Sequence, residues 1–126
     1  MTIIGIGTDI INIYRIKSII LNYGDNFAIR ILSKNELYEY NKNKDKARFI
    51  SKIFSVKESI SKALGFGITK GIYFSQFEIY KNNLGKPLVH FLSKSLYLAI
   101  KLKINKIFIT ISDEKKYVIS TVILEK

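Results

Sequence analysis

The amino-acid sequence predicts an α+β fold with an N-terminal strand, several helices including a long central one, and an antiparallel sheet. An isoleucine-rich, strand-like segment occupies residues 2–11, and a helical pattern covers about residues 46–64. Two further strand-like segments, residues 106–111 and 117–124, are joined by a short polar turn and must therefore be antiparallel. At 126 residues, 48% of them hydrophobic, the chain is expected to form one compact domain, residues 1–126.

The first strand carries glycines beside a carboxylate. Because side chains alternate along a strand, Gly5, Gly7 and Asp9 lie on one face. Glycine weakens a strand and usually marks a place where another element approaches closely. The surface beside Asp9 therefore leaves room for a helix or a ligand.

Helical spacing predicts two helices after this strand. Ile13, Ile16 and Ile20 share one face of a helix that ends at the polar cluster of residues 22–26. A second, shorter helix is predicted over residues 27–32.

A capping box and a long apolar pattern predict the next two helices. Ser33 and Glu36 form the capping box, so a short helix begins after Ser33. The long helix of residues 46–64 has one apolar stripe at intervals of three and four residues: Phe49, Ile53, Val56, Ile60 and Ala63. Glu58 lies opposite this stripe beside Phe54, so the second face is expected to cover a cleft or a neighbouring subunit.

The remaining elements are a strand pair and a helix. Alternation predicts a strand over residues 74–80, and the Asn- and Gly-containing turn at residues 82–85 leads into a strand at residues 87–91. Ser93 is expected to cap the amphipathic helix that follows.

The charge balance favours an anionic partner. Lys and Arg total 21 against 10 acidic residues, a net charge of +11. Such a charge attracts nucleic acid, a nucleotide cofactor or an acidic protein, although an AT-biased genome that places lysine at solvated positions explains it equally well. By charge alone, a small basic nucleic-acid-binding module is the alternative function.

Composition also limits the compartment and the chemistry. The chain has no cysteine, so disulfides and thiolate metal sites are excluded. No apolar run reaches the roughly 18 residues of a membrane span, and the N-terminus lacks the basic region of a signal peptide. We therefore expect a cytoplasmic protein that does not insert into membranes.

Three charged residues in apolar segments are candidates for chemistry. Glu58 and Lys62 are one helical turn apart, which by itself fits an ordinary ion pair worth about 0.3–0.5 kcal/mol. Asp9 alone fits a strand-end residue. Packing the glycine-bearing strand on the helix would bring both carboxylates together, where they repel unless a cation or a proton joins them. Mg²⁺ accepts one or two carboxylates together with waters and phosphate oxygens, so these residues fit a phosphate-handling magnesium enzyme.

Two motifs resemble the signature of the holo-acyl-carrier-protein synthases, the short homotrimeric type of 4′-phosphopantetheinyl transferase. They are GIGTDI at residues 5–10 and FSVKESISKALGFG at residues 54–67. The resemblance implies transfer of the phosphopantetheine arm of coenzyme A to a serine of apo-acyl carrier protein, with release of adenosine 3′,5′-bisphosphate, in fatty acid biosynthesis.

The resemblance also implies residue roles. Asp9 and Glu58 would bind Mg²⁺ at the pyrophosphate, and Lys62 would bind the phosphate that is transferred, which makes these three the catalytic set. The serine proton would pass to Glu58 or to a water activated by the metal. Arg15 and Arg30 match positions that bind the acidic carrier protein. The family is typically a homotrimer with active sites between subunits.

Several positions depart from the family pattern. The residues expected to bind coenzyme A are Lys62, Gly65, Arg48 and Lys46, the last two because the usual Arg of the family is replaced. The departures are Asn12 for Glu, Ile53 for Arg, Phe66 for Thr and Asp113 for His. They leave open a further reading, a structural subunit that has lost its activity.

Overall fold

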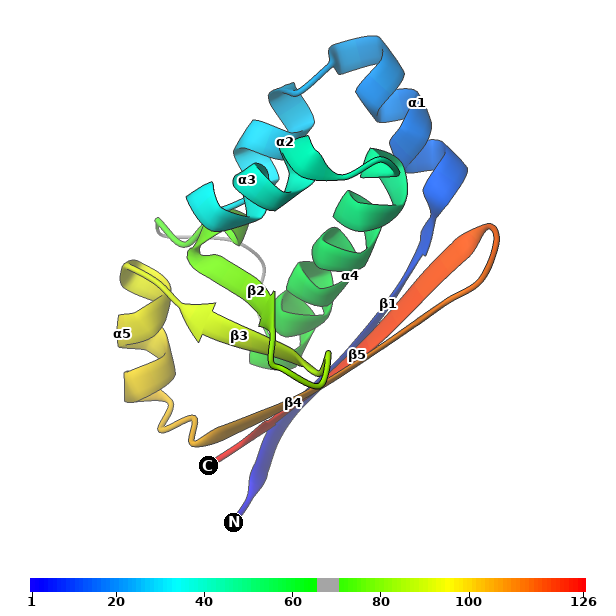
Figure 1. Cartoon of the computed structure of the whole chain (residues 1–126). Helices are drawn as coiled ribbons and strands as arrows, with labels where there is room; N and C mark the ends of the chain where they lie inside the picture. The colour runs from blue at the N-terminus through cyan, green and yellow to red at the C-terminus, as the bar shows by residue number, and fades with distance from the viewer. Residues whose placement is uncertain (66–70) are drawn as a thin grey trace.

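The computed structural model describes residues 1–65 and 71–126 and confirms the α+β class (Figure 1). In chain order the elements are β1 (Ile3–Asn12), α1 (Ile13–Tyr23), α2 (Asn26–Ile31), α3 (Lys34–Lys42), α4 (Lys46–Leu64), the short 3₁₀ helix η1 (Phe74–Gln76), β2 (Phe77–Lys81), β3 (Pro87–Phe91), α5 (Lys94–Lys101), β4 (Lys106–Asp113) and β5 (Tyr117–Glu125). The predicted roles of Phe66 and Gly67 lie outside the described residues.

Two antiparallel sheets organise these elements. The larger has the order β1-β5-β4, and the smaller is the β2–β3 hairpin. In the larger sheet Asp9 of β1 is paired with Ser120 of the central strand β5. The helices and the hairpin lie on one side of this sheet, with α4 directly against it, and both termini lie at the same end (Figure 1).

The glycines of β1 let α4 approach the strand backbone to backbone. A Cβ atom at Gly5 would lie 1.8 Å from the carbonyl oxygen of Ala63, and one at Gly7 would lie 1.9 Å from that of Ser59. Both distances are impossible for real atoms, so any side chain would push the helix away. The predicted close approach is confirmed, and a helix rather than a ligand fills the space.

The second face of α4 is only partly covered within the chain: Phe54 and Glu58 are half-buried and Lys62 is exposed. The expectation that this face covers a cleft or a neighbouring subunit stays a prediction. The hydroxyls of Ser55 and Ser59 each lie 2.7 Å from the hydroxyl of Ser120 in β5. Phe54 packs edge-to-face on Phe74, with ring centroids 5.6 Å apart. The sheet thus covers the serine side of α4, while Phe27 of α2 and Phe74 of η1 pack on Phe54.

The far side of the large sheet is an uncovered apolar surface. We call this the outer face: it consists of the outward side chains of β1, β5 and β4, including Ile6, Ile10, Phe108 and Ile119. Ile10 is 63% exposed and Ile119 is 45% exposed. No other described element packs on this side of the sheet (Figure 1).

Most helix and strand bounds predicted from the sequence are confirmed, and two predictions need correction. The capping box of Ser33 and Glu36 is formed, and α4 has the predicted bounds. The first strand of the hairpin begins at Phe77 rather than residue 74, because the preceding three residues form the turn η1. Ser93 precedes α5 but makes no side-chain capping bond; its φ is 54°, and the hydroxyl of Ser95 bonds the carbonyl of Leu92 instead.

Across the described residues, every helix is too short or too polar to traverse a lipid bilayer.

Candidate active site

Asp9 of β1 and Lys62 of α4 meet where the strand crosses the last turn of the helix. The Nζ atom of Lys62 lies 3.2 Å from Oδ1 of Asp9 and donates a 2.9 Å hydrogen bond to the carbonyl of Thr8. The Lys62 side chain is 55% exposed, whereas that of Asp9 is 14% exposed. Among the described residues, Lys62 forms its ion pair with Asp9 and none with Glu58, so the ordinary pairing within the helix is not what the structure shows.

The second carboxylate oxygen of Asp9 is unsatisfied. Oδ2 is buried and has no hydrogen-bond partner in the described structure. An unsatisfied buried polar group typically costs about 1–3 kcal/mol, and more when it is charged. Such an atom in a native protein requires an explanation, and a bound cation supplies one.

Glu58 lies within electrostatic reach of Asp9. Burial raises the pKa of the Glu58 carboxyl, the negative charge of Asp9 raises it further, and the ammonium of Lys62 opposes both. Two carboxylates therefore share this corner of the molecule with one partly exposed ammonium. This juxtaposition is what the sequence predicted, and it follows from the glycine contact between β1 and α4.

The end of α4 places Lys62 at the surface. Gly65 adopts a left-handed conformation, with φ of 86°, and its N–H bonds the carbonyl of Lys62 at 3.1 Å. The helix therefore stops immediately beyond Lys62, where the partial negative charge of a helix C-terminus favours a cation.

The ligand atoms available here suit a hard cation that takes only a few of its ligands from the protein. The described residues hold no cluster of three or more His, Cys, Asp or Glu side chains suited to a metal. Asp9 and Glu58 supply two carboxylates, and Mg²⁺ is commonly held by one or two carboxylates plus waters and substrate phosphates. Asn12, which replaces an acid of the family pattern, has a different task here: its Oδ1 accepts the N–H of Tyr14 at 3.0 Å and caps α1.

Two of the residues expected to bind coenzyme A lie at the other end of α4. About 21 Å of helix separates Arg48 from Lys62 at 1.5 Å per residue. Within one chain, Arg48 and Lys46 are therefore not brought together with Lys62 and Gly65.

Arg48 and its neighbour Lys52 converge on Asp113. The Nη1 atom of Arg48 lies 2.6 Å from one carboxylate oxygen of Asp113, and Nζ of Lys52 lies 3.6 Å from the other. Burial alone would raise the pKa of Asp113, but the hydrogen bond from Arg48 and the charges of Lys52 and Arg48 lower it overall. Asp113 thus ties the β4–β5 turn to the N-terminal half of α4. Lys46 also points inward, donating to the carbonyl of Asn43 at 3.0 Å.

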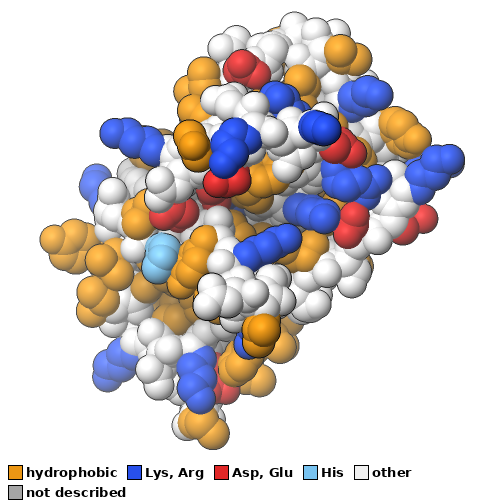
Figure 2. All heavy atoms as spheres, in the orientation of Figure 1, with side chains coloured by type: hydrophobic (Ala, Val, Ile, Leu, Met, Phe, Trp, Pro, Cys, Tyr) orange, Lys and Arg blue, Asp and Glu red, His pale blue; other side chains and the backbone are white. Residues whose placement is uncertain are grey.

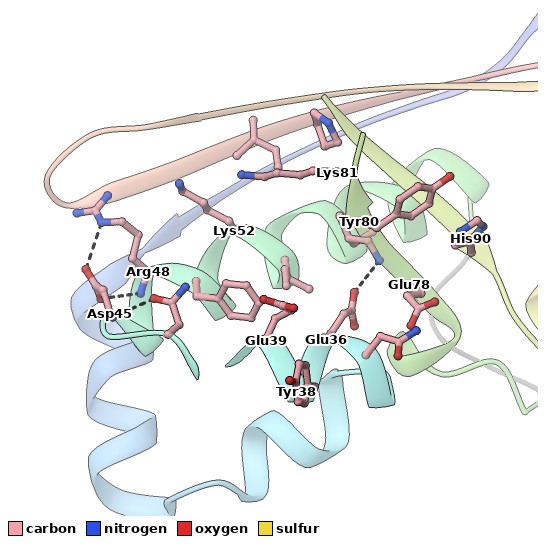
Figure 3. A pocket seen from close by; sticks show the side chains of 17 residues that line it. Glu36, Tyr38, Glu39, Asp45, Arg48, Lys52, Glu78, Tyr80, Lys81 and His90 are labelled. Carbon is pink, nitrogen blue, oxygen red and sulfur yellow. Dashed lines mark hydrogen bonds and ion pairs between the residues drawn. The ribbon is translucent and has the colours of Figure 1, made fainter. Parts of the chain in front are cut away.

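A cavity of about 800 Å³ lies beside this cluster, between α3, α4 and the β2–β3 hairpin (Figure 3). Arg48 and Lys52 line it from α4, and Tyr80 and His90 line it from the hairpin. The rings of Tyr80 and His90 are stacked at 4.0 Å. Sequence reasoning missed this cavity because its walls combine α3 and α4 with the β2–β3 hairpin and with Ile111 of β4, which are separate segments of the chain.

Arg15 and Arg30, the expected carrier-binding residues, are both exposed, on α1 and α2 respectively. Neither has an ion pair or a side-chain hydrogen bond within the described parts of the chain, and α1 and α2 pack on each other. Lys and Arg side chains are spread over this helical end of the molecule, interrupted by acidic ones (Figure 2).

Comparison with known proteins gives one consistent result. A sequence profile described as the 4′-phosphopantetheinyl transferase superfamily matches residues 5–122. The holo-[acyl-carrier-protein] synthase of Buchnera aphidicola is 55% identical over 126 residues, covering 100% of both chains, and that of Erwinia tasmaniensis is 44% identical over 125 residues, covering 99% of both.

Solved structures agree with the sequence relatives. The crystal structure of holo-[acyl-carrier-protein] synthase from Neisseria meningitidis superposes with a TM-score of 0.92 at 33% identity, covering 99% of this chain and 100% of that one. The Helicobacter pylori synthase in complex with coenzyme A gives a TM-score of 0.81 at 29% identity, covering 95% and 99%.

Proposed function

Because this chain belongs to the 4′-phosphopantetheinyl transferase superfamily, and within it to the holo-[acyl-carrier-protein] synthases, we propose that Asp9 and Glu58 hold the Mg²⁺ ion of its reaction. The enzyme transfers phosphopantetheine from coenzyme A to apo-acyl carrier protein. The observation that carries the metal assignment is the buried, unpartnered Oδ2 of Asp9 beside a second carboxylate whose pKa is raised.

Each residue of this corner has a distinct task. When bound, Mg²⁺ supplies fixed positive charge to the pyrophosphate oxygens, on which negative charge develops during phosphoryl transfer. Asp9 offers its free oxygen to the cation while its other oxygen keeps Lys62 in place. Lys62, exposed and adjacent, donates to the phosphate that is transferred. The serine proton has two available acceptors, Glu58 and a water beside it.

Coenzyme A is proposed to bind between two subunits. Lys62 and Gly65 would contact it from one chain, and Arg48 and Lys46 from the neighbour, because about 21 Å of helix separates the two groups in a single chain. The cluster around Asp113 would then replace the Arg and His contacts that the family pattern has elsewhere.

A homotrimer is supported by the outer face of the β1-β5-β4 sheet. Its exposed isoleucines form an apolar surface of the kind that marks subunit interfaces. We therefore propose that the trimer interface lies on this sheet. We further propose that residues 1–126 act as one transferase domain in the cytoplasm, since the relatives align with the whole chain.

The carrier protein is proposed to dock on α1 and α2. Arg15 and Arg30 are exposed and unpaired among the described residues, as a surface for an acidic partner requires. The same positive charge was the sole basis for a nucleic-acid-binding alternative, which no feature of the site favours.

The decisive experiment is to incubate the enzyme with coenzyme A, MgCl₂ and apo-acyl carrier protein and to measure the carrier by intact mass spectrometry. We expect the carrier to gain one phosphopantetheine group, and this gain to disappear with EDTA and with Asp9→Asn. Transfer that persists in metal-free buffer would remove the proposed role of Asp9 and Glu58.

A further inference from the structure

Lys57, the residue before Glu58, is a charged side chain with no solvent exposure. Its side chain is 0% exposed, and its Nζ atom donates to the carbonyl of Ile31 at 2.8 Å, to Oε1 of Glu36 at 2.6 Å and to the carbonyl of Phe74 at 2.9 Å. These three bonds use all three protons of the ammonium. The ammonium therefore ties α4 to the end of α2, to α3 and to η1.

Glu36 extends these connections. Its Oε1 also accepts the N–H of Ser33 at 2.8 Å, and its Oε2 accepts the N–H of Ile79 at the start of the hairpin at 2.6 Å. The hydroxyl of Ser33 donates to Glu78 at 2.7 Å, and Glu36 and Glu78 lie at one end of the cavity (Figure 3). One buried ion pair thus joins four elements that precede and follow α4.

A buried ion pair is a poor source of stability. The desolvation of both charges offsets their attraction, so apolar side chains of similar size often serve as well or better. What a fully bonded ammonium provides is geometry: three acceptors in fixed directions that only one placement of α4 satisfies.

The two neighbours Lys57 and Glu58 leave the same turn of α4 in different directions. Lys57 bonds the carbonyl of Ile31, the residue after Arg30, whereas Glu58 faces Asp9. Building on the proposed function, we infer that Lys57 is a positioning residue, which fixes the separation between the metal ligand Glu58 and the carrier-docking surface of α1 and α2.

This separation matters because the carrier serine must reach the phosphorus atom. Reacting atoms must approach within about 3–3.5 Å, and a displacement of about 1 Å by a remote change costs about 100-fold in rate. Loosening the Lys57 contacts would leave the donor site intact while misaligning the acceptor.

The test is the double variant Lys57→Met/Glu36→Gln, which removes both charges without leaving either one buried alone. We expect kcat per folded enzyme to fall about 10- to 100-fold, as in a misaligned site. The KM for coenzyme A and the Kd for the carrier, measured by surface plasmon resonance, should stay within about twofold of the wild type.

The matched control is Tyr40→Leu, a fully buried change on α3 that does not touch the ammonium. It should lower the melting temperature and leave kcat per folded enzyme unchanged. Normal kcat in the double variant, or a parallel loss of coenzyme A binding, overturns the inference. If the double variant does not fold, Lys57→Arg, which keeps the buried charge beside Glu36 but replaces the ammonium by a planar guanidinium that cannot reach the same three acceptors, must show the same fall in kcat. The wild type is assayed alongside, so absence of transfer there identifies a failure of the proposed function instead.

Discussion

Lys62 on α4 lies 3.2 Å from Asp9 on β1, joining the last turn of the long helix to the N-terminal strand. The pair leaves one oxygen of Asp9 without a partner and Glu58 without a cation of its own among the described residues. The two carboxylates at this corner outnumber the one ammonium, so the local charge is negative. The first two predictions rest on this excess of negative charge.

Removing either carboxylate should separate activity from folding. We expect Glu58→Gln and Asp9→Asn to reduce transfer by at least about 100-fold. Each removes a carboxylate ligand of the proposed Mg²⁺ ion, whose positive charge stabilises the transition state. Both variants should elute like the wild type in size-exclusion chromatography. Glu39→Gln, an exposed acid on α3, is the control and should transfer normally. Near-normal turnover in Glu58→Gln would contradict the metal role.

The raised pKa of Glu58 predicts a pH-dependent stability in metal-free enzyme. A folded-state pKa above the unfolded one means that the folded protein binds the proton more tightly, so stability falls as pH rises through the folded pKa. Glu58→Gln should therefore melt at a higher temperature than the wild type at pH 7 to 8, with the difference shrinking toward pH 4. Asp113, whose pKa is lowered, is common to both proteins, so its loss of stability at acid pH cancels in the comparison.

Saturating Mg²⁺ is the control for this pH series. A cation that holds Glu58 ionised should raise the melting temperature of the wild type near neutral pH and leave Glu58→Gln little changed. If the difference in melting temperature between the wild type and Glu58→Gln does not vary with pH, then desolvation of Glu58 and its repulsion from Asp9 are not the source of that difference.

Gly7 should tolerate no side chain. The added methyl of Gly7→Ala would lie 1.9 Å from the carbonyl oxygen of Ser59, so α4 must shift away from β1. We expect a loss of about 3 kcal/mol in the free energy of unfolding, the upper range for overpacking, measured by urea denaturation. Gly65→Asn is the control, because no atom of the described residues lies within 4 Å of a Cβ placed there and Asn tolerates the left-handed backbone; it should cost under about 1 kcal/mol. Equal costs in the two variants would contradict the backbone contact.

Charge reversal on α1 or α2 should act on the carrier alone. We expect Arg15→Glu and Arg30→Glu each to raise the KM for apo-acyl carrier protein by about tenfold, an effect that weakens as salt increases. Coenzyme A affinity should not change, and Lys101→Glu at the end of α5 should leave both constants unaltered. A matching loss of coenzyme A binding would place the carrier surface elsewhere.

A charge on the outer face should disrupt the assembly. Ile119 is 45% exposed on the central strand, so Ile119→Glu would bury a carboxylate at the proposed interface. We expect light scattering to report a monomer in place of a trimer and transfer to be lost with it. Tyr97→Glu, at a 78% exposed site on α5, should keep the wild-type mass. A wild-type mass for Ile119→Glu would exclude this face as the interface.

The sequence predicted best what local interactions determine. The long helix has its expected bounds because an apolar stripe and Gly65 define it, and the capping box of Ser33 forms as read. The approach of Asp9 to Glu58 was also predictable in part, since two glycines in a strand indicate that a helix or a ligand comes close to it.

Long-range pairings were beyond a reading of the sequence. Lys57 looks solvated in any hydropathy pattern, and its partner Glu36 was explained by the capping box, so nothing indicated that the two share a buried ion pair. The expectation that Arg48 contacts coenzyme A stays a prediction, but nothing in the sequence indicated its ion pair with Asp113 from the last hairpin. In both cases the deciding partner lies on a different element, 21 and 65 residues away.

The bare contact of Gly5 and Gly7 with α4 has a consequence for cation capture. No rotatable side chain separates the strand from the helix, so main-chain atoms alone set the spacing of the two acids. The fold therefore holds Asp9 near Glu58, and a cation bound at the proposed site would offset the repulsion between these carboxylates without requiring β1 or α4 to move.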